Sequence, residues 1–302
     1  MSARILITGI NGFVGRHITK ELLTNKDIKI MGFDRNINSS FGENVSIRTV
    51  NLLDKENLKK AVSEFKPSTV IHLAAIANVV YGNVGELYDI NVHGSENLLD
   101  VLYDVCDNGT RVILTSTAGV YGNSGVDFDT EETPYNPANH YSFSKMVMEY
   151  ISKNYTDKLD IRIVRPFNMI GVGQNESFLI PKLVRAFASK QPELQIGNMN
   201  TFRDFVDIEF AAKFFCKLAL QPNVEPRVLN LCAGHGTTGN DILGMLQDIT
   251  KYSPKISVNP EFVRKNEIMR LVGDPTKCNA FINNEFKTKP VYAILSEMVK
   301  QY

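Results

Sequence analysis

The first half of the chain alternates short, continuously apolar runs with longer stretches in which apolar residues recur every three to four positions. The short runs predict strands buried on both faces, and the longer stretches predict amphipathic helices. Strands separated by helices in this way form a parallel sheet through right-handed crossovers. The predicted strands are 3–8, 28–33, 45–50, 68–74, 111–116 and 161–166, and the helical stretches between them include 18–23, 56–65 and 96–105.

The alternation weakens after Pro166. Residues 207–220 and 227–232 again predict a helix and a strand of the sheet, whereas the rest of the second half holds more turns, prolines and isolated helices. We therefore expect a doubly wound parallel (Rossmann) α/β sheet with a smaller, discontinuous α/β substrate lobe. The expected domain with the large sheet is 1–165 plus about 205–234, and the expected second lobe is about 166–204 plus 235–302.

Composition and charge describe an ordinary globular protein: 302 residues, 43% hydrophobic and 22% charged, with a formal net charge of zero. Without a basic run there is no electrostatic footprint for nucleic acid or a membrane surface, so we expect neither as a partner. Four widely separated cysteines favour a reducing compartment and make a metal site improbable. The apolar N-terminal run is too short for a signal peptide or a membrane span, and we expect a cytoplasmic enzyme.

A glycine-rich turn, "TGINGFVG" from Thr8 to Gly15, follows the first predicted strand and opens the first helix. Glycines at these spacings let the turn tighten and let a diphosphate approach the backbone at the helix N-terminus. Asp34 ends the second strand, where an acid accepts hydrogen bonds from a ribose diol, which favours NAD(H). Arg35 follows it and suits a 2′-phosphate, so NADP(H) stays open. The alternatives are a tight turn without a ligand and a solvated Asp34.

Small and polar residues also follow the next strands, as expected where a dinucleotide lies. Asn51 and Leu52 follow the third strand, at the place where such folds meet adenine, and Asp54 is expected to cap the next helix. "HLAA" closes the fourth strand with small residues that allow close approach of a ligand. His72 within it is expected to be a core histidine rather than a catalyst.

A hydroxyl, a phenol and an ammonium form the strongest candidate for chemistry. Thr117 follows the fifth strand, and Tyr141 and Lys145 are one helical turn apart on the next helix. A phenol titrates near 10, so it works at neutral pH only if a cation lowers its pKa, and we expect Lys145 to supply that cation. Thr117 would bind the substrate oxygen and Tyr141 would transfer its proton. A chance Tyr-x-x-x-Lys and a simple turn hydroxyl are the alternatives.

Taken in order, these motifs resemble the extended short-chain dehydrogenase/reductase superfamily, whose members act on nucleotide-diphospho-sugars. The resemblance rests on the glycine turn, the acid after strand two, His-Leu-Ala-Ala, "NVHG", Ser-Thr before "GVYG", Tyr-x-x-x-Lys and "RPFN", and it covers nearly the whole chain. It implies that Thr117, Tyr141 and Lys145 are the catalytic triad. One departure is Asn51, where the family has aspartate; an amide oxygen still accepts from the adenine amino group.

The resemblance also implies a cofactor site and a substrate site. Asn91 would lie near the nicotinamide ribose, Phe167 would line the nicotinamide site, and Asn168 would touch the sugar diphosphate. The implied cofactor-binding residues are Gly9, Gly12, Phe13, Val14, Gly15, Asp34, Arg35, Asn51, Leu52, Leu73, Ala74, Ala75, Asn91, Tyr141, Lys145 and Phe167. The implied substrate-binding residues are Thr117, Asn168, Arg203, Arg264 and Glu267.

Two segments of the second lobe narrow the range of possible substrates. Residues 196–212 resemble the diphosphate-binding segment of these enzymes, with Arg203 as a bidentate anion clamp. An ion pair of Arg203 with Asp204 or Asp207 is the alternative. Residues 263–277 look like a second segment with Arg264 on the diphosphate and Glu267 as an acid, although Lys265 replaces the family's proline. Together they are most similar to GDP-4-keto-6-deoxy-mannose reductases and related 4-ketohexose reductases.

The residues after Thr117 discriminate among the family's reactions. Ala118 and Gly119 stand where dehydratases, decarboxylases and C3/C5 epimerase–reductases carry acid–base side chains, which leaves chemistry at C4 alone. We therefore predict NAD(P)H-dependent reduction of a nucleotide-diphospho-4-keto-6-deoxy-hexose. The alternatives are a UDP-hexose 4-epimerase with tightly bound NAD and a non-catalytic nucleotide-sensing protein. Family likeness and two broadly apolar helices, about 86–105 and 141–155, suggest a homodimer.

Overall fold

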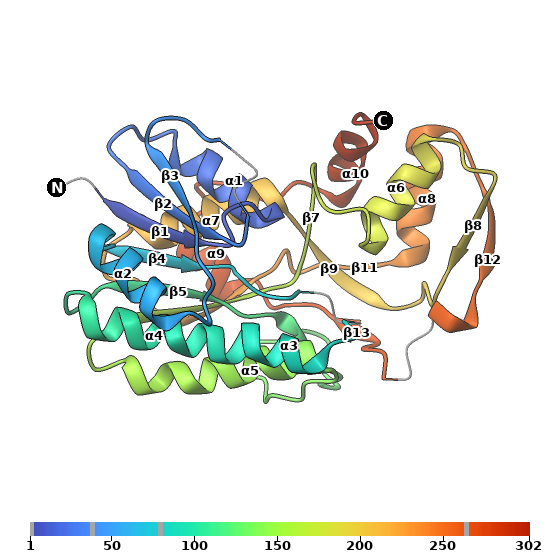
Figure 1. The fold of residues 1–302 in the computed structure, drawn as a ribbon. Coiled ribbons are helices and arrows are strands. Elements are labelled where there is room, and N and C mark those ends of the chain that lie inside the picture. The colour runs from blue at the N-terminus through green and yellow to red at the C-terminus, as the bar shows by residue number, and fades with distance from the viewer. Residues whose placement is uncertain (1–2, 37–39, 78–80, 263–265) are drawn as a thin grey trace. The chain divides into compact units, whose positions relative to one another are not determined.

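The computed structural model describes residues 3–36, 40–77, 81–262 and 266–302 (Figure 1). The chain divides into two compact units, which are described here one at a time. The first unit comprises 1–120, 139–165 and 212–229, and the second comprises 121–138, 166–211 and 230–302. This differs from the expected division in three places, because segments 121–138, 205–211 and 230–234 belong to the second unit. The physical reason is pairing: each of these segments forms backbone hydrogen bonds with strands or loops of the second unit.

The sheet of the first unit confirms the predicted fold class. It has seven parallel strands in the order β10-β6-β5-β4-β1-β2-β3. The strand order runs outward from β1 first in one direction and then in the other, which is typical of a doubly wound sheet. Its central strands are apolar on both faces and almost wholly buried, as the continuous apolar runs predicted. The strands are β1 (Arg4–Thr8), β2 (Lys29–Asp34), β3 (Val45–Thr49), β4 (Thr69–His72), β5 (Arg111–Thr115), β6 (Asp160–Pro166) and β10 (Val228–Leu231).

Helices cover both faces of this sheet (Figure 1). Helices α2 (Lys55–Phe65), α4 (Gly94–Val105) and α5 (His140–Ser152) pack on one face, where their apolar residues join those of the strands in one core. Helices α1 (Phe13–Leu22) and α7 (Ile208–Leu220) lie on the other face, and the Cys216 thiol of α7 donates to the carbonyl of Ile18 in α1 (3.7 Å). Burial of these apolar stripes is the main source of the unit's stability.

One long helical segment of the first unit contains a wide turn. Helix α3 (Val84–Tyr88) continues into a π-helical turn, η1 (Asp89–His93), and then into α4. A π-turn holds one residue more than an α-turn and commonly marks a functional site. Here it carries Asn91, which is wholly buried.

The second unit is built from much shorter strands gathered around β9 (Phe202–Asp207). Strands β7 (Asn168–Ile170), β11 (Gly236–Thr238) and β13 (Arg270–Leu271) all pair with β9, and β8 (Glu193–Ile196) pairs separately with β12 (Lys255–Val258). Helices α6 (Leu179–Ala188), α8 (Gly239–Thr250) and α10 (Val291–Val299) enclose a second apolar core, while α9 (Thr276–Ile282) is shorter.

Side chains hold much of the irregular backbone of this unit. The buried Asp204 carboxylate accepts hydrogen bonds from the backbone N–H groups of Ala233 and Gly234 (2.8 Å each) and Gly273 (3.3 Å). Asn230 accepts from the Tyr121 hydroxyl (2.6 Å) and donates to the carbonyl of Asp129. Polar side chains of this kind satisfy backbone groups that no strand partner reaches.

Candidate active site

The glycine turn after β1 has the shape that a diphosphate requires. Gly9 has a φ of +72°, and a Cβ there would stand 2.9 Å from the backbone nitrogen of Ala74. A Cβ on Gly15, in the first turn of α1, would stand 2.5 Å from the carbonyl oxygen of Gly9. Gly12 is the N-cap of α1 and, having no side chain, leaves the helix N-terminus open to an anion. The residues present therefore fit a dinucleotide, with Phe13 and Val14 as the first two residues of the helix.

Asp34 closes β2 beside that turn. Its two carboxylate oxygens accept from the backbone N–H groups of Asn11 (2.9 Å) and Arg35 (2.8 Å), so the carboxylate is held in a fixed orientation next to the glycine turn. The Arg35 side chain is 70% exposed and lies 4.0 Å from the Glu86 carboxylate. The acid is thus anchored, whereas the guanidinium is held only by a surface ion pair, which is worth little.

The residues expected at adenine divide between surface and core. Asn51 is exposed, and its side-chain oxygen accepts from the backbone N–H of Leu53 (3.1 Å). The Leu52 side chain is buried in the core that α4 covers, against Gly94. Leu73, Ala74 and Ala75 follow β4 and are partly buried. Adenine contact by any of these residues stays a prediction.

His72 and Asn91 lie in one buried hydrogen-bond network. The His72 ring bonds to the hydroxyls of Thr8 (2.7 Å) and Ser95 (2.9 Å), and burial together with the nearby Lys145 ammonium lowers its pKa to about 3. A neutral imidazole with both nitrogens bonded is a structural group. Asn91 bonds through its side chain to the N–H and carbonyl of Ile76 and to the Ser144 hydroxyl. The Asn91 side chain therefore fixes the chain after β4. Contact of Asn91 with a cofactor stays a prediction.

Thr117, Tyr141 and Lys145 come together in the first unit. Asn139 caps α5 by accepting from the N–H of Ser142 (2.9 Å), which sets Tyr141 in the first turn. The Tyr141 hydroxyl is hydrogen bonded to Thr117. Lys145 is 2% exposed, and its ammonium donates to the carbonyl of Thr115 (2.8 Å). Threonine hydroxyl, phenol and ammonium thus line the end of β5 and one face of α5.

The pKa of Tyr141 moves opposite to the expected direction. We expected Lys145 to lower it, but burial raises it to about 12, and only the hydrogen bond from Thr117 opposes the rise. Burial also lowers the pKa of Lys145 to about 8, against the pull of the Glu149 carboxylate. The reason is that desolvation disfavours the charged form of both groups. At neutral pH the phenol is therefore protonated and suited to donate a proton.

Glu149 is a member of this site that the motifs did not indicate. It lies wholly buried on α5, where it accepts hydrogen bonds from the buried Arg165 guanidinium of β6 and from the Ser116 hydroxyl. The spacing of Tyr141, Lys145 and Glu149 by four residues was the available signal, since it places all three on one helix face. It was missed because an acid within a helix is usually solvated.

The remaining expected residues lie in the second unit. Phe167 is buried and Asn168 opens β7, in register with Phe205. Arg203 of β9 donates to the carbonyl of Phe202 (2.8 Å), while the side chain of Glu267 accepts from that of Asn198 (2.9 Å). Asp204 and Asp207, the alternative partners of Arg203, both accept from backbone N–H groups. Arg264 lies outside the described residues.

The space beside Thr117 is tight, and a side chain at position 119 would have to displace the Ser142 hydroxyl. A Cβ on Gly119 would stand 2.4 Å from the Ser142 hydroxyl oxygen and 3.3 Å from that of Thr117. Ala118 is 1% exposed and has no titratable group. The two residues that follow Thr117 therefore bring no acid or base to this end of the sheet.

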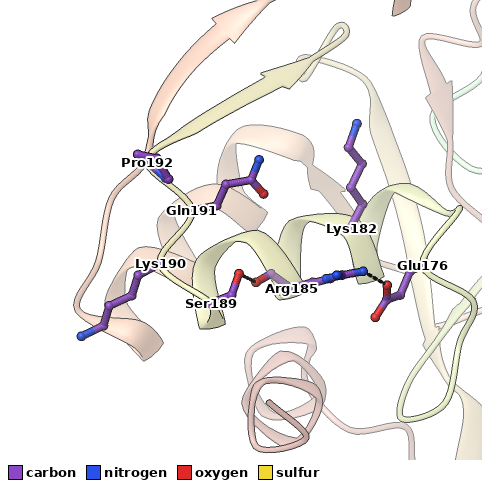
Figure 2. Close-up of a pocket in the computed structure, with 7 residues that line it drawn as sticks. All are labelled: Glu176, Lys182, Arg185, Ser189, Lys190, Gln191 and Pro192. Carbon is purple, nitrogen blue, oxygen red and sulfur yellow. Dashed lines mark hydrogen bonds and ion pairs between the residues drawn. The ribbon is translucent and has the colours of Figure 1, made fainter.

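A surface hollow elsewhere, in the second unit, has a different character. Figure 2 shows that it runs along α6, with the Arg185 guanidinium bonded to the Glu176 carboxylate. It is lined by Glu176, Lys182, Arg185, Ser189, Lys190, Gln191 and Pro192. Its one acid is already paired with its arginine, and it contains none of the expected catalytic residues.

Among the described residues there is also no group of three acids, histidines or cysteines that could hold a metal, and no helix long and apolar enough to cross a membrane.

The fold and this site define an α/β protein with a dinucleotide turn and a Thr-Tyr-Lys set at the carboxyl end of its sheet. The family model described as "NAD dependent epimerase/dehydratase family" matches residues 5–232. The chain therefore belongs to that family, the extended short-chain dehydrogenases/reductases, as the ordered motifs indicated.

Individual relatives cover nearly the whole chain. A GDP-6-deoxy-D-talose 4-dehydrogenase of Aggregatibacter actinomycetemcomitans is 33% identical over 297 residues, 98% of this chain and 97% of that protein. A GDP-6-deoxy-D-mannose reductase of Pseudomonas aeruginosa is 27% identical over 285 residues, 90% of this chain and 88% of that protein. The crystal structure of a putative epimerase from Burkholderia cenocepacia is 32% identical, with a TM-score of 0.89 over 99% of this chain and 98% of that one.

Proposed function

We propose that this protein is a nucleotide-sugar 4-reductase, which reduces the 4-ketone of a GDP-4-keto-6-deoxy-hexose with a reduced nicotinamide cofactor. The relatives named GDP-6-deoxy-D-talose 4-dehydrogenase and GDP-6-deoxy-D-mannose reductase support the GDP-6-deoxyhexose substrate class. The ordered motifs favour the same class, since the segments around Arg203 and Glu267 resemble those of 4-ketohexose reductases.

The observation that carries the choice of reaction is that Ala118 and Gly119, the two residues after Thr117, supply no acid or base in a space that is already tight. A side chain at position 119 would collide with Ser142, and Ala118 has no proton to transfer. Dehydration and C3/C5 epimerisation both need an additional proton-transfer group. Among the residues described at this end of the sheet, Tyr141 is the group suited to transfer a proton, which supports chemistry at a single carbon.

The chain's own residues have distinct tasks in this reaction. A reduced nicotinamide cofactor, held at the glycine turn by residues such as Gly9 and Gly12, would supply the hydride when bound. Tyr141 is protonated at neutral pH and gives its proton to the C4 oxygen, and the Thr117 hydroxyl orients that oxygen. The Lys145 ammonium favours the phenolate that remains, because a nearby cation stabilises an anion in a poorly solvated site.

NAD(H) is the cofactor we favour. The Asp34 carboxylate is anchored by two backbone N–H groups and can accept hydrogen bonds from a ribose diol. The same negative charge would repel the 2′-phosphate of NADP(H). We further propose that Arg203, Asn168 and Glu267 bind the sugar nucleotide. A homodimer remains part of the proposal, since Phe143 and Tyr150 of α5 are 45% and 50% exposed.

Loss of reduced-nicotinamide absorbance tests this function directly. The protein is mixed with the GDP and dTDP forms of a 4-keto-6-deoxy-hexose, each with NADH and with NADPH. We expect stoichiometric oxidation with the GDP form and NADH. No oxidation with any pair, combined with nicotinamide that stays on the protein through purification, would instead favour a 4-epimerase, the activity named for a relative 31% identical over 297 residues.

A further inference from the structure

Three side chains of α5 lie on one helix face at the candidate site. Tyr141, Lys145 and Glu149 follow one another at intervals of four residues, so they stack along one side of the helix. Lys145 is 2% exposed and Glu149 is wholly buried. A buried carboxylate one turn beyond a buried ammonium is its natural counter-charge.

Glu149 is itself held from two strands. The Arg165 guanidinium donates to both carboxylate oxygens, through Nε to Oε1 (3.1 Å) and through Nη2 to Oε2 (2.7 Å). The hydroxyl of Ser116, the residue before Thr117, donates to Oε1 as well. Because Arg165 is 3% exposed and Ser116 is 2% exposed, the carboxylate is a desolvated anion tied to the ends of β5 and β6.

The groups around Lys145 show why an anion is needed there. On α5 it is flanked by Tyr141 and Glu149, and the Glu149 carboxylate is bound by Arg165 of β6. His72 of β4 interacts with the charge of Lys145. Burial alone drives a lysine toward the neutral form, and His72 contributes no anion. The negative charge described near the ammonium is that of Glu149.

We infer that Glu149 is a positioning residue, clamped by Arg165 and Ser116, that keeps Lys145 charged and fixes Thr117 beside Tyr141. This inference rests on the proposed function, because a charged Lys145 matters only if Tyr141 transfers a proton. A purely structural ion pair is the competing explanation, since replacing one partner of any buried pair is destabilising. The two explanations differ in what happens to the titration of Lys145.

Glu149→Gln is the decisive variant, because it keeps the shape and removes the charge. Lys145 is followed by NMR in protein labelled with ¹³C-lysine, with its signal assigned by loss in Lys145→Met and with the exposed Lys153 as internal control. We expect the pKa of Lys145 to fall by roughly 1 to 3 units, the usual effect of losing a close opposite charge. Ser116→Ala, which removes a hydrogen bond but no charge, should leave that titration nearly unchanged.

The same shift should appear in turnover. As the pH rises, Lys145 is the first member of the site to lose its proton, so the basic limb of kcat/KM should move to lower pH in Glu149→Gln by the same amount. Titration needs no substrate, so a shifted Lys145 in a protein that oxidises no cofactor would contradict the proposed function and leave the charge role standing.

A second variant keeps the inference testable if Glu149→Gln does not fold. Glu149→Gln with Arg165→Met removes both charges, which buried pairs often tolerate without loss of stability. We expect Lys145 in this protein to titrate between the wild type and Glu149→Gln, because the unpaired guanidinium is gone as well. Wild-type titration of Lys145 in either variant would overturn the inference and leave Glu149 a structural residue.

Discussion

Buried polar side chains have different partners in the two units. In the first unit, the buried charged side chains of Lys145, Glu149 and Arg165 belong to the same site as the phenol that we propose transfers a proton. In the second unit, the buried side chains of Asp204 and Asn230 form hydrogen bonds with backbone N–H and carbonyl groups of loops.

The difference follows from strand length. Strands of four to seven residues in a seven-stranded sheet satisfy their own backbone, so buried side chains are available to bind each other and a ligand. Strands of two or three residues, such as β13 and β7, leave backbone groups that only side chains can reach. The contrast is therefore one of degree. In the first unit, buried side chains such as Lys145 and Glu149 are available for function, although Asn91 still binds the backbone of Ile76. In the second unit, Asp204 and Asn230 hold loops.

Among the variants that test this contrast, Tyr141→Phe is expected to have the largest effect. Removing the phenol hydroxyl should lower turnover by a factor on the order of 10²–10⁴, the usual contribution of a positioned acid, with little change in stability. Steady-state rates of reduced-nicotinamide oxidation measure it. Tyr150→Phe, an exposed tyrosine on the same helix, is the matched control, and near-normal turnover in Tyr141→Phe would remove the phenol from the mechanism.

Asp204→Ala should affect stability instead. Three backbone N–H groups lose a buried acceptor, so we expect the free energy of unfolding to fall by about 3 to 5 kcal/mol. Urea unfolding of the whole chain provides the measurement. Asp248→Ala, which removes an exposed carboxylate that binds Lys251 and Tyr292 in the same unit, should leave the urea midpoint nearly unchanged. Equal losses in the two variants would mean that Asp204 does not hold these loops.

Gly119→Ala probes the space beside Thr117. The added methyl meets the Ser142 hydroxyl, and overpacking of this kind costs about 1 to 3 kcal/mol. Removing that hydroxyl in the double variant Gly119→Ala with Ser142→Ala should restore most of the loss in thermal unfolding. If the single variant is as stable as the wild type, room for a side chain exists and the exclusion of other reactions weakens.

The smallest effect is expected at His72. Its pKa is about 3 in the folded protein, below the ordinary value of about 6.5 in an unfolded chain, so the unfolded state binds more protons between these values. Stability contributed by the neutral ring is present above pH 6.5 and is lost as the pH falls. Linkage gives a loss of about 0.7 kcal/mol between pH 7 and 6. His72→Gln should lack this increment; an unchanged pH dependence would contradict the burial of a neutral imidazole.

The same contrast explains what could be predicted from the sequence. Buried parallel strands appear as continuous apolar runs, so every strand of the seven-stranded sheet was located to within one or two residues. Strands β7, β11 and β13 are too short to produce a period, and the loop 121–138 joins the second unit through bonds such as Tyr121 to Asn230 that no local pattern reports.

The candidate site was predictable where a motif fixes it and not where burial decides. Thr117, Tyr141 and Lys145 were found from ordered motifs, and the structure brings them together. The raised pKa of Tyr141 was not predicted, because it depends on how much water the fold removes from the phenol. Glu149 was missed for the same reason: its spacing from Tyr141 and Lys145 indicates a shared helix face, but does not show that the acid on that face is buried.

The wide turn η1 lets the α3–α4 segment hold one residue more than a regular helix without turning the faces that follow it. An α-helix advances by about 100° per residue, whereas a π-turn such as Asp89–His93 takes up one extra residue within about the same rotation. Removing that residue would convert η1 to an ordinary turn and leave the apolar face of α4 on the sheet, whereas a deletion within α4 itself would rotate the residues that follow it by about 100°. Homologues are therefore expected to gain or lose a residue of this segment at η1 and not within α4.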